Sequence, residues 1–345
     1  MLPNMYTAEG WINPNVIIDN PCPFVLVIGG RGIGKTYGVL SEVYKRRIPF
    51  LYMRRTQIQL DSVTVPALSP FNQINKDMGI NVCCEKIGKN TIGFYDGKIQ
   101  EDGTITPEGA ALGVGIALST FASIRGMSAE KYEVLIFDEV IPERHERPIK
   151  EEELAFANAL ESLNRNRELL GRKPLKVILL SNSNTINSRI IAALGCTNEL
   201  EKMRRKNQSY KELNGDIAII RYIDSPISER KKNTALYRVI QNNDFQKMSL
   251  DNDFAASDFE QVINKPLKEY NPVVSVGNMT VYKHKTNREY YVISGVKSQV
   301  RFSTLPIDIK AFKTQYPHLY GAYIHKRLFF QNAQTKIEFE RVWNV

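Results

Sequence analysis

The sequence predicts an α/β protein with a mostly parallel sheet covered by helices on both faces, followed by a linker and a smaller α+β domain. Two observations lead to this fold class. Short apolar runs alternate with helical patterns through the first two hundred residues, and short alternating β runs replace them after about residue 250. A chain of 345 residues is long enough for two domains. We therefore predict a first domain over residues 1–213, a linker over 214–250 and a C-terminal domain over 251–345.

The individual elements are predicted from apolar runs and from the turn-forming residues that bound them. Helical patterns cover residues 35–44 and 150–170, and the Asp-Gly pairs at 96–97 and 102–103 predict hairpin turns. Residues 225–250 are polar and mixed, which favours a linker with some helix. The predicted strands of the first domain are 23–29, 49–53, 114–119, 133–137 and 175–180, and those of the second are 273–276, 279–284 and 289–294.

Charge is distributed unevenly along the chain. Residues 1–200 carry 22 basic and 22 acidic side chains, so residues 201–345 carry the remaining 24 basic and 15 acidic ones, and 24 − 15 gives the whole net charge of +9. A neutral part followed by a basic part indicates two tasks, the second one involving a polyanion. An idle basic surface is the alternative.

Several classes of protein are excluded or disfavoured by the same inspection. No apolar run approaches the roughly 20 residues that span a bilayer, so no membrane association is expected. Residues 1–10 show no basic segment followed by an apolar stretch, and no secretory signal is expected. The four cysteines follow no framework spacing, which favours reduced thiols in a cytoplasm.

A phosphate-binding loop follows the first predicted strand. The motif G-x-x-x-x-G-K-[ST] is complete and lies between a strand and a helix, as that loop requires. Glycines allow backbone N–H groups to point at phosphates, Lys35 would reach the β and γ oxygens, and the Thr36 hydroxyl would bind Mg²⁺. ATP and Mg²⁺ are therefore the expected ligands. The nucleotide-binding residues are Gly29, Gly30, Arg31, Gly32, Ile33, Gly34, Lys35 and Thr36.

Polar residues also end two later strands. Asp138 and Glu139 follow the apolar run Val134 to Phe137; the first would complete the metal site and the second would activate a water for attack on the γ-phosphate. Asn182 ends the strand at 175–180 and would lie beside the γ-phosphate. A helix cap or turn is the alternative for Asn182.

Three groups of arginines and lysines have less specific patterns. Arg165 and Arg167 lie two positions apart, so they cannot share a helix face, and one can point into a neighbouring subunit as a trans-acting finger. A solvated pair is the alternative, and Arg54 with Arg55 can be surface charges at a strand end. Nucleic-acid contacts are assigned to the basic run of Arg230, Lys231 and Lys232.

These motifs together resemble one known family. VIGGRGIGKT, YMRRT, FYDGK, IFDEV, NRNRE, LLSNS and MSLDN (248–252) occur in this order in the genome-packaging ATPases of small podophages with terminal-protein-capped DNA, the Picovirinae type. The resemblance extends from about Val25 to Phe254. A segment around Arg125 is also similar to phage large terminase subunits. Gln57 stands where a relative has a lysine, so a role of that lysine in DNA contact does not carry over.

The resemblance implies a function and partners. It implies an ATP-driven motor, a homopentameric ring at the portal of a procapsid in the host cytoplasm, absent from the mature virion, which moves double-stranded DNA inward. The first domain would be an additional-strand, catalytic-glutamate ATPase. Besides Lys35 and Glu139, the resemblance implies catalytic roles for Arg165, as the arginine finger, and Arg125, as a basic residue acting between subunits. The C-terminal domain would resemble an RNase H-type nuclease without its acids, and would bind portal and a packaging RNA.

Other functions stay open on the sequence alone. A large-terminase-type enzyme that also cuts DNA would need about three converging carboxylates around metal ions. No acid after residue 250 lies inside an apolar strand in the manner of such a site, which favours a domain that has lost its nuclease. A P-loop kinase or nucleotide-switched module, and a nucleic-acid-binding module with an incidental phosphate loop, are further alternatives.

Overall fold

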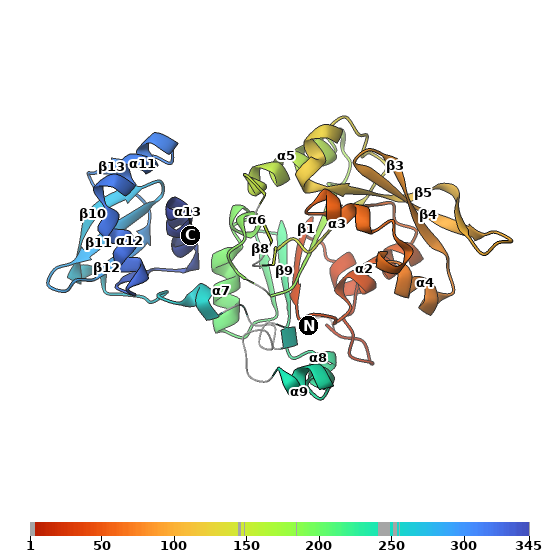
Figure 1. Cartoon of the computed structure of the whole chain (residues 1–345), viewed down its shortest axis with the longest axis horizontal. Helices are drawn as coiled ribbons and strands as arrows, with labels where there is room; N and C mark the ends of the chain where they lie inside the picture. Colours follow the sequence, from red (N-terminus) through yellow and green to blue (C-terminus); the bar gives the residue numbers. More distant parts are fainter. Residues whose placement is uncertain are drawn as a thin grey trace. The chain divides into compact units, whose positions relative to one another are not determined.

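The structure, a computed structural model, describes residues 4–143, 146–147, 149–183, 185–240, 249–250, 254 and 256–344. The chain forms two compact units (Figure 1). The first comprises Met1–Ala193 and Met203–Phe254, and the second comprises Leu194–Lys202 and Ala255–Val345. The predicted end of the first domain at residue 213 is revised, because Met203–Phe254 belong to the first unit.

The first unit is built on a nine-stranded sheet with the order β3-β4-β5-β2-β6-β7-β1-β9-β8. Its six inner strands, β5 to β9 in that order, are all parallel, while β3, β4 and β8 add antiparallel edges. The strands are β1 (Phe24–Gly29), β2 (Phe50–Arg54), β3 (Val82–Gly88), β4 (Thr91–Ile99), β5 (Ile105–Ala117), β6 (Val134–Asp138), β7 (Lys176–Ser181), β8 (Tyr210–Leu213) and β9 (Ile217–Tyr222).

The strand order confirms the predicted fold class. β7 lies between β1, which precedes the glycine loop, and β6, which ends in Asp138. This is the additional strand that the sequence resemblance implied. Because all these strands are parallel, their carboxyl ends meet at one edge of the sheet, where α/β proteins bind ligands.

Helices cover both faces of this sheet, as the continuous apolar runs predicted. One face packs against α1 (Asn15–Ile18), α2 (Lys35–Lys45), α3 (Gln57–Ser62) and α4 (Asn72–Met78), whose apolar residues join the strands in one core. On the other face Phe156 of α5 (Glu152–Asn164) contacts Phe137 of β6, with ring centroids 5.8 Å apart. Short 3-10 helices occupy Pro66–Leu68, Leu118–Ile124 and Glu168–Leu170.

Two predicted local features are wrong. Asp96 and Gly97 lie inside β4 and form no turn; a register irregularity precedes Asp96, and the hairpin turn is at residues 100–104. The helix predicted over 150–170 ends at Asn164, because Arg165 adopts a positive φ of 44° that no α-helix accommodates. The hairpin of β4 and β5 projects beyond the remainder of the first unit (Figure 1).

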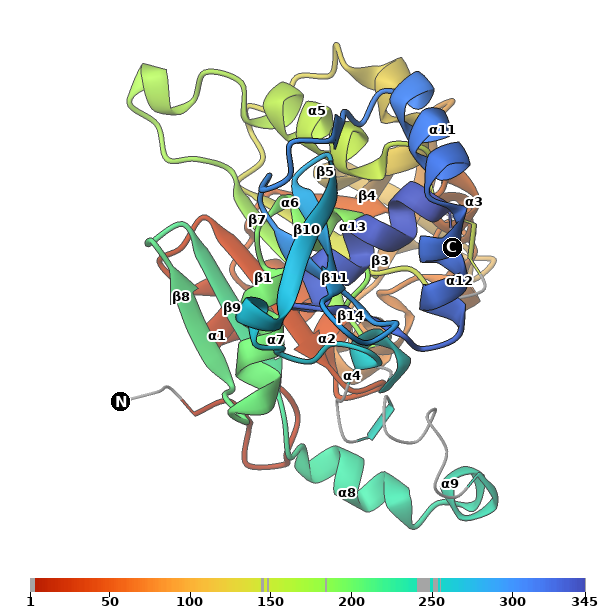
Figure 2. The ribbon, with the colours of Figure 1, turned by 90° about the vertical axis from the view of Figure 1, so that its left-hand side faces the viewer.

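The predicted linker over 214–250 is also revised. β9 lies inside this stretch and pairs with β1 over six residues, from Phe24↔Ile217 to Gly29↔Tyr222. It is part of the sheet core because its residues Ala218, Ile219 and Ile220 are fully buried. After it come α8 (Pro226–Lys232) and α9 (Ala235–Val239), which belong to the same unit (Figure 2).

The second unit is α+β, as predicted. Its five-stranded sheet has the order β13-β10-β11-β12-β14, with β10, β11 and β12 as an antiparallel meander and a parallel strand at each end. The carboxylate of Glu201 accepts a 2.9 Å hydrogen bond from Ala333 N at the start of α13, where a negative charge is favourable. The strands are β10 (Tyr270–Val276), β11 (Met279–His284), β12 (Tyr290–Ser294), β13 (Arg301–Phe302) and β14 (Leu328–Phe330).

The remaining helices complete this description. They are α6 (Arg189–Ala193), α7 (Thr197–Arg205), α11 (Pro306–Gln315), α12 (Pro317–Ile324), α13 (Ala333–Trp343) and the 3-10 helices Ala256–Phe259 and Leu267–Glu269. Among the described residues, no helix combines the length and apolar composition needed to cross a bilayer. The RNase H character of the second unit stays a prediction.

A buried ion pair joins the end of β2 to the start of α5. Arg55 is 1% exposed and Glu152 is 2% exposed. Arg55 Nε donates to Glu152 Oε1 at 2.8 Å, and its NH1 group donates to Glu146 Oε2 at 2.6 Å. The interpretation of Arg55 as a surface charge is therefore wrong. The pair fixes α5 relative to the strand that neighbours β6.

We expect Glu152→Ala to destabilise the first unit by about 3–5 kcal/mol, because it leaves the Arg55 guanidinium buried without its main partner. Thermal unfolding followed by circular dichroism measures this. Glu153→Ala is the matched control: Glu153 is partly exposed and lies 3.8 Å from Arg189, so its loss should cost no more than about 1 kcal/mol. Equal effects of the two substitutions would contradict a special role for the buried pair.

Candidate functional site

A cavity lies at the edge where the carboxyl ends of the parallel strands meet. Its volume is about 380 Å³, and it lies between the glycine loop after β1 and the ends of β6 and β7. The structure therefore brings most of the predicted nucleotide and metal residues to one place. The lining residues are Arg31, Gly32, Gly34, Lys35, Thr36, Tyr37, Asp138, Glu139, Leu180, Ser181 and Asn182.

The glycine loop leads from β1 directly into α2. Gly32 and Gly34 have φ values of 65° and 93°, which a residue with a Cβ rarely adopts. Lys35, the first residue of α2, is buried, and its Nζ donates to Gly29 O at 2.9 Å, to Gly30 O at 2.7 Å and to Asn182 Oδ1 at 2.8 Å. Burial lowers the pKa of Lys35 to about 7. The loop thus holds a lysine amine at the N-terminus of a helix, a position that suits an anion.

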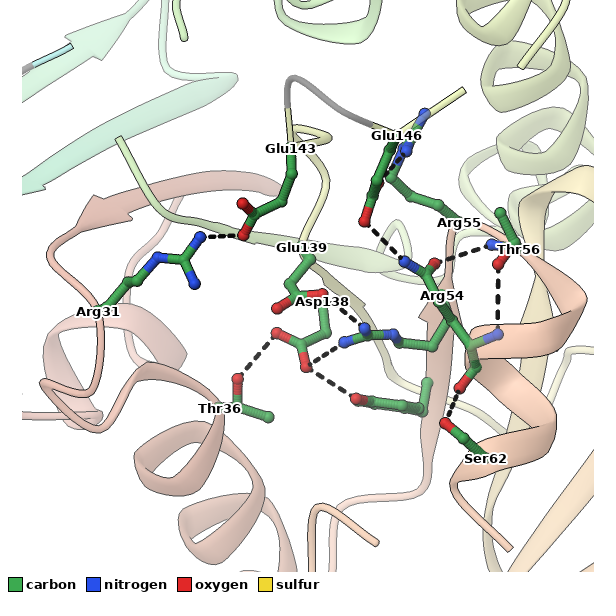
Figure 3. A network of polar contacts seen from close by, with 12 residues as sticks. Arg31, Thr36, Arg54, Arg55, Thr56, Ser62, Asp138, Glu139, Glu143 and Glu146 are labelled. Carbon is green, nitrogen blue, oxygen red and sulfur yellow. Dashed lines mark hydrogen bonds and ion pairs between the residues drawn. The ribbon is translucent and has the colours of Figure 1, made fainter. Parts of the chain in front are cut away.

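Asp138 is the point where three elements meet. Its Oδ1 accepts a hydrogen bond from the Thr36 hydroxyl at 2.8 Å, and its Oδ2 accepts from the Tyr52 hydroxyl at 2.8 Å and from Arg54 NH1 at 3.0 Å (Figure 3). Burial, followed by the negative charge of Asp138, raises the pKa of Tyr52 well above its usual range, so the phenol stays a donor. These bonds fix the carboxylate against α2 and β2.

Glu139 is held in a different way. Its φ is 58°, a left-handed conformation that is unfavourable for a residue with a side chain and that is found at functional sites. Arg54 NH2 donates to Glu139 Oε2 at 2.6 Å, so this single guanidinium joins both adjacent carboxylates (Figure 3). Arg54 is partly buried, and its interpretation as a surface charge is wrong. Glu139 itself remains about half exposed at the cavity.

The segment after Glu139 is tied to the site at two points. Arg31 of the glycine loop forms an ion pair with Glu143 (Figure 3). Glu146 accepts from Arg55, and its second oxygen accepts from Gln59 at 3.2 Å. The glycine loop, the end of β2 and this segment are therefore connected by charge pairs that the sequence did not reveal.

The two arginines predicted to act between subunits lie away from the cavity of their own chain. Arg165 and Arg125 are exposed, and neither lines the cavity. Arg165 NH2 donates to Met127 O at 3.2 Å, so Arg165 lies against the segment that follows Arg125. Arg167, in contrast, is buried and donates to Ala129 O at 2.7 Å, which gives it a structural role.

The basic run on α8 does not present one continuous charged face. Arg230 NH2 donates to Glu9 O at 2.7 Å, and Lys232 pairs with Glu229 at 2.6 Å. Lys231 Nζ instead donates to the backbone carbonyl of Arg31 at 2.5 Å. Nucleic-acid contacts of this run stay a prediction. Most of the MSLDN motif lies outside the described residues.

The fold and the site define an α/β protein with a glycine loop between the parallel strand β1 and the helix α2 that follows it. Comparison with family models then identifies the chain further: residues 8–295 match the Podovirus DNA encapsidation protein (Gp16) family. The chain belongs to this family of DNA packaging proteins, in agreement with the resemblance noted from its motifs.

Individual relatives agree with this assignment. The DNA packaging protein of Bacillus phage phi29 is 26% identical over 270 residues, which cover 76% of this chain and 71% of that protein. The DNA packaging protein of Bacillus phage B103 is 29% identical over 263 residues, covering 74% and 70%. Among solved structures, the bacteriophage Phi-29 viral genome packaging motor assembly matches with a TM-score of 0.66 and 19% identity, over 97% of this chain and 99% of that one. This last likeness shows a shared fold.

The site offers oxygen ligands of the type that Mg²⁺ prefers, the Thr36 hydroxyl and the Asp138 carboxylate, beside a loop that suits phosphates. Sequence reasoning missed Tyr52 and Arg54, which hold that carboxylate. The signal that could have found them is the polar end of the strand at 49–53, but only the strand order shows that this strand lies beside β6.

We expect Tyr52→Phe to raise the Mg²⁺ concentration needed for half-maximal nucleotide binding about tenfold, because partners that orient a metal ligand are worth this much. Binding of a fluorescent ADP analogue at increasing Mg²⁺ measures it. Tyr44→Phe removes a comparable hydroxyl-to-carboxylate bond, to Asp96 at 2.9 Å, and serves as control. An unchanged Mg²⁺ requirement in Tyr52→Phe would contradict the role of this hydroxyl.

Proposed function

We propose that this chain is an ATP-hydrolysing motor that translocates double-stranded viral DNA into a preformed procapsid. The observation that carries the proposal is the convergence of Lys35, Thr36, Asp138 and Glu139 on one cavity at the carboxyl edge of a parallel sheet. A glycine loop, a lysine, a hydroxyl and two adjacent acids are the groups that hydrolysis of a nucleoside triphosphate requires. Family membership supplies the DNA packaging role.

The residues would divide the work as follows. Backbone N–H groups of the glycine loop bind the phosphates, and Lys35 turns from the carbonyls of Gly29 and Gly30 toward the β and γ oxygens. Thr36 and Asp138 would hold Mg²⁺, which when bound neutralises phosphate charge and orients the γ-phosphate. Asn182, already bonded to Lys35, would respond to the presence of the γ-phosphate.

Glu139 would act as the base that activates water. In the structure its carboxylate is bonded to Arg54, so this carboxylate must turn from the guanidinium toward the cavity before it can accept a proton. Glu139, whose backbone is left-handed, lines the cavity, which supports this role. Arg54 would then remain bonded to Asp138 through its NH1 group.

A ring of identical subunits completes the proposal. Arg165, with Arg125 near the segment it contacts, is exposed and outside the cavity of its own chain, as a finger for a neighbouring subunit must be. We assign the chain to a homopentamer on the portal vertex of the procapsid, with double-stranded DNA and a packaging RNA as partners. It would work in the host cytoplasm and be absent from the mature virion. The second unit would contact nucleic acid or procapsid.

ATP turnover with and without procapsids and double-stranded DNA is the test of this function. Turnover that rises when both are added supports a packaging motor. Turnover that ignores both favours a nucleotide-switched module, and absence of turnover under all conditions contradicts the proposal.

Glu139→Gln should bind ATP with nearly unchanged affinity and hydrolyse it at least about 100-fold more slowly, because the amide cannot accept the proton of the attacking water. Phosphate release at saturating ATP, with equilibrium binding as the companion measurement, checks both parts. Turnover close to that of the natural sequence would remove Glu139 from the role of base.

Arg165→Ala should reduce turnover of mixed assemblies more than in proportion to its share, because each altered subunit disables its neighbour's site. Phosphate release at a series of mixing ratios measures this. Arg172→Ala is a matched control, since Arg172 is also partly exposed and donates to the carbonyl of Glu130 at 2.6 Å. A strictly linear decline with Arg165→Ala would argue against a finger.

A further inference from the structure

Lys231 lies on the glycine loop, although the sequence places it two hundred residues away. Its Nζ donates to the backbone carbonyl of Arg31 at 2.5 Å. It also fills the space beside Gly32, where a Cβ would come within 2.3 Å of that nitrogen. Burial lowers the pKa of Lys231 from its ordinary value. The loop therefore has a second lysine, on its outer side, besides Lys35 in the cavity.

The same segment of chain reaches the loop at a second point. The carbonyl of Ser249 accepts a 3.0 Å hydrogen bond from Arg31 N. This contact is close, because a Cβ on Gly30 would lie only 2.6 Å from the Ser249 oxygen. Both polar backbone groups of Arg31 are thus held by the segment that follows β9. We call these two contacts, of Lys231 Nζ and of Ser249 O, the loop clasp.

The loop clasp has a clear physical consequence for phosphate binding. A phosphate loop works by aiming its N–H groups inward, which leaves backbone carbonyls directed outward and in need of donors. A lysine cation is a strong donor to such a carbonyl, and its charge adds to the positive field of the loop.

We propose that Lys231 is a positioning residue of the nucleotide site: through the loop clasp it fixes the Arg31 peptide, and thereby the orientation of the neighbouring N–H groups of the glycine loop that would bind phosphate. This rests on the proposed binding of nucleotide at the loop. The clasp residues belong to the stretch of chain that joins β9 to the second unit. Because coupling between two sites is reciprocal, nucleotide that stabilises the loop also stabilises this stretch.

The test compares nucleotide binding by full-length Lys231→Met with that of the natural sequence, using a fluorescent ADP analogue and Mg²⁺. We expect the dissociation constant to rise about tenfold or more, the effect of losing one charge-assisted hydrogen bond. Lys231→Arg, which keeps the charge and a donor, should restore most of the affinity. Lys206→Met removes an equal charge from an exposed position of the same unit and should leave binding unchanged.

Steady-state kinetics distinguish a positioning role of Lys231 from a general loss of structure in the variant. In Lys231→Met the KM for ATP should rise about as much as the dissociation constant, while kcat at saturating ATP falls less than about threefold. Hydrogen exchange gives a second readout. In the natural sequence, which needs no variant, ADP with Mg²⁺ should slow exchange in residues 225–240. Where Lys231→Met folds, this slowing should be absent from it.

The outcomes distinguish the two proposals. If the natural sequence binds no nucleotide, the proposed function fails. If it binds nucleotide but Lys231→Met binds equally well, the inference is wrong and the proposed function stands. Should Lys231→Met fail to fold, hydrogen exchange of the natural sequence still decides, because exchange in 225–240 that ignores nucleotide overturns the inference.

Discussion

The carboxylate of Asp138 is the interaction on which the site depends. Three donors from three places in the sequence meet on it: Thr36 at the start of α2, and Tyr52 and Arg54 on β2. Asp138 is 7% exposed, and a buried carboxylate with too few donors would be expensive to keep ionised. The need to satisfy this one charge therefore fixes the glycine loop, β2 and β6 relative to one another.

The two arginines at the end of β2 extend that constraint in opposite directions. Arg54 points to the adjacent acids in the cavity, while Arg55 points to the other side and binds Glu146 and Glu152. Consecutive residues of an extended chain point to opposite sides. Arg54, the last residue of β2, and Arg55, which follows it, can therefore bind carboxylates on opposite sides of the strand. One guanidinium holds the proposed base, and the other holds the helix that ends just before Arg165. A displacement at the end of β2 would therefore move the contacts of both Glu139 and α5.

The glycine loop is supported from both sides in the same unit. Lys35 donates to its carbonyls from within the cavity, and Lys231 donates to a carbonyl from outside. Arg31 is joined to Glu143 of the segment after Glu139. The loop that would bind phosphate is therefore connected both to the proposed base and to the stretch of chain that leads toward the second unit. These connections give the proposed motor a physical route between the nucleotide site and α8.

By itself the sequence determined the fold class and most buried strands, because these depend on local apolar runs. Glycine spacing and polar strand ends likewise predicted the loop residues, the adjacent acids and Asn182, which remain proposals as functional residues. Only the tertiary structure decided the partners of those residues. In the sequence Arg54 and Arg55 look like surface charges, and Lys231 looks like part of a nucleic-acid-binding run. Strand order instead places β2 beside β6, and the pairing of β9 with β1 brings α8 to the loop. The sequence predicts a linker over the range of β9, because nothing local in it indicates that this strand pairs with β1. A strand's neighbours are set by packing across the whole sheet, and hydrogen bonds between residues a hundred or more positions apart leave no mark on local sequence.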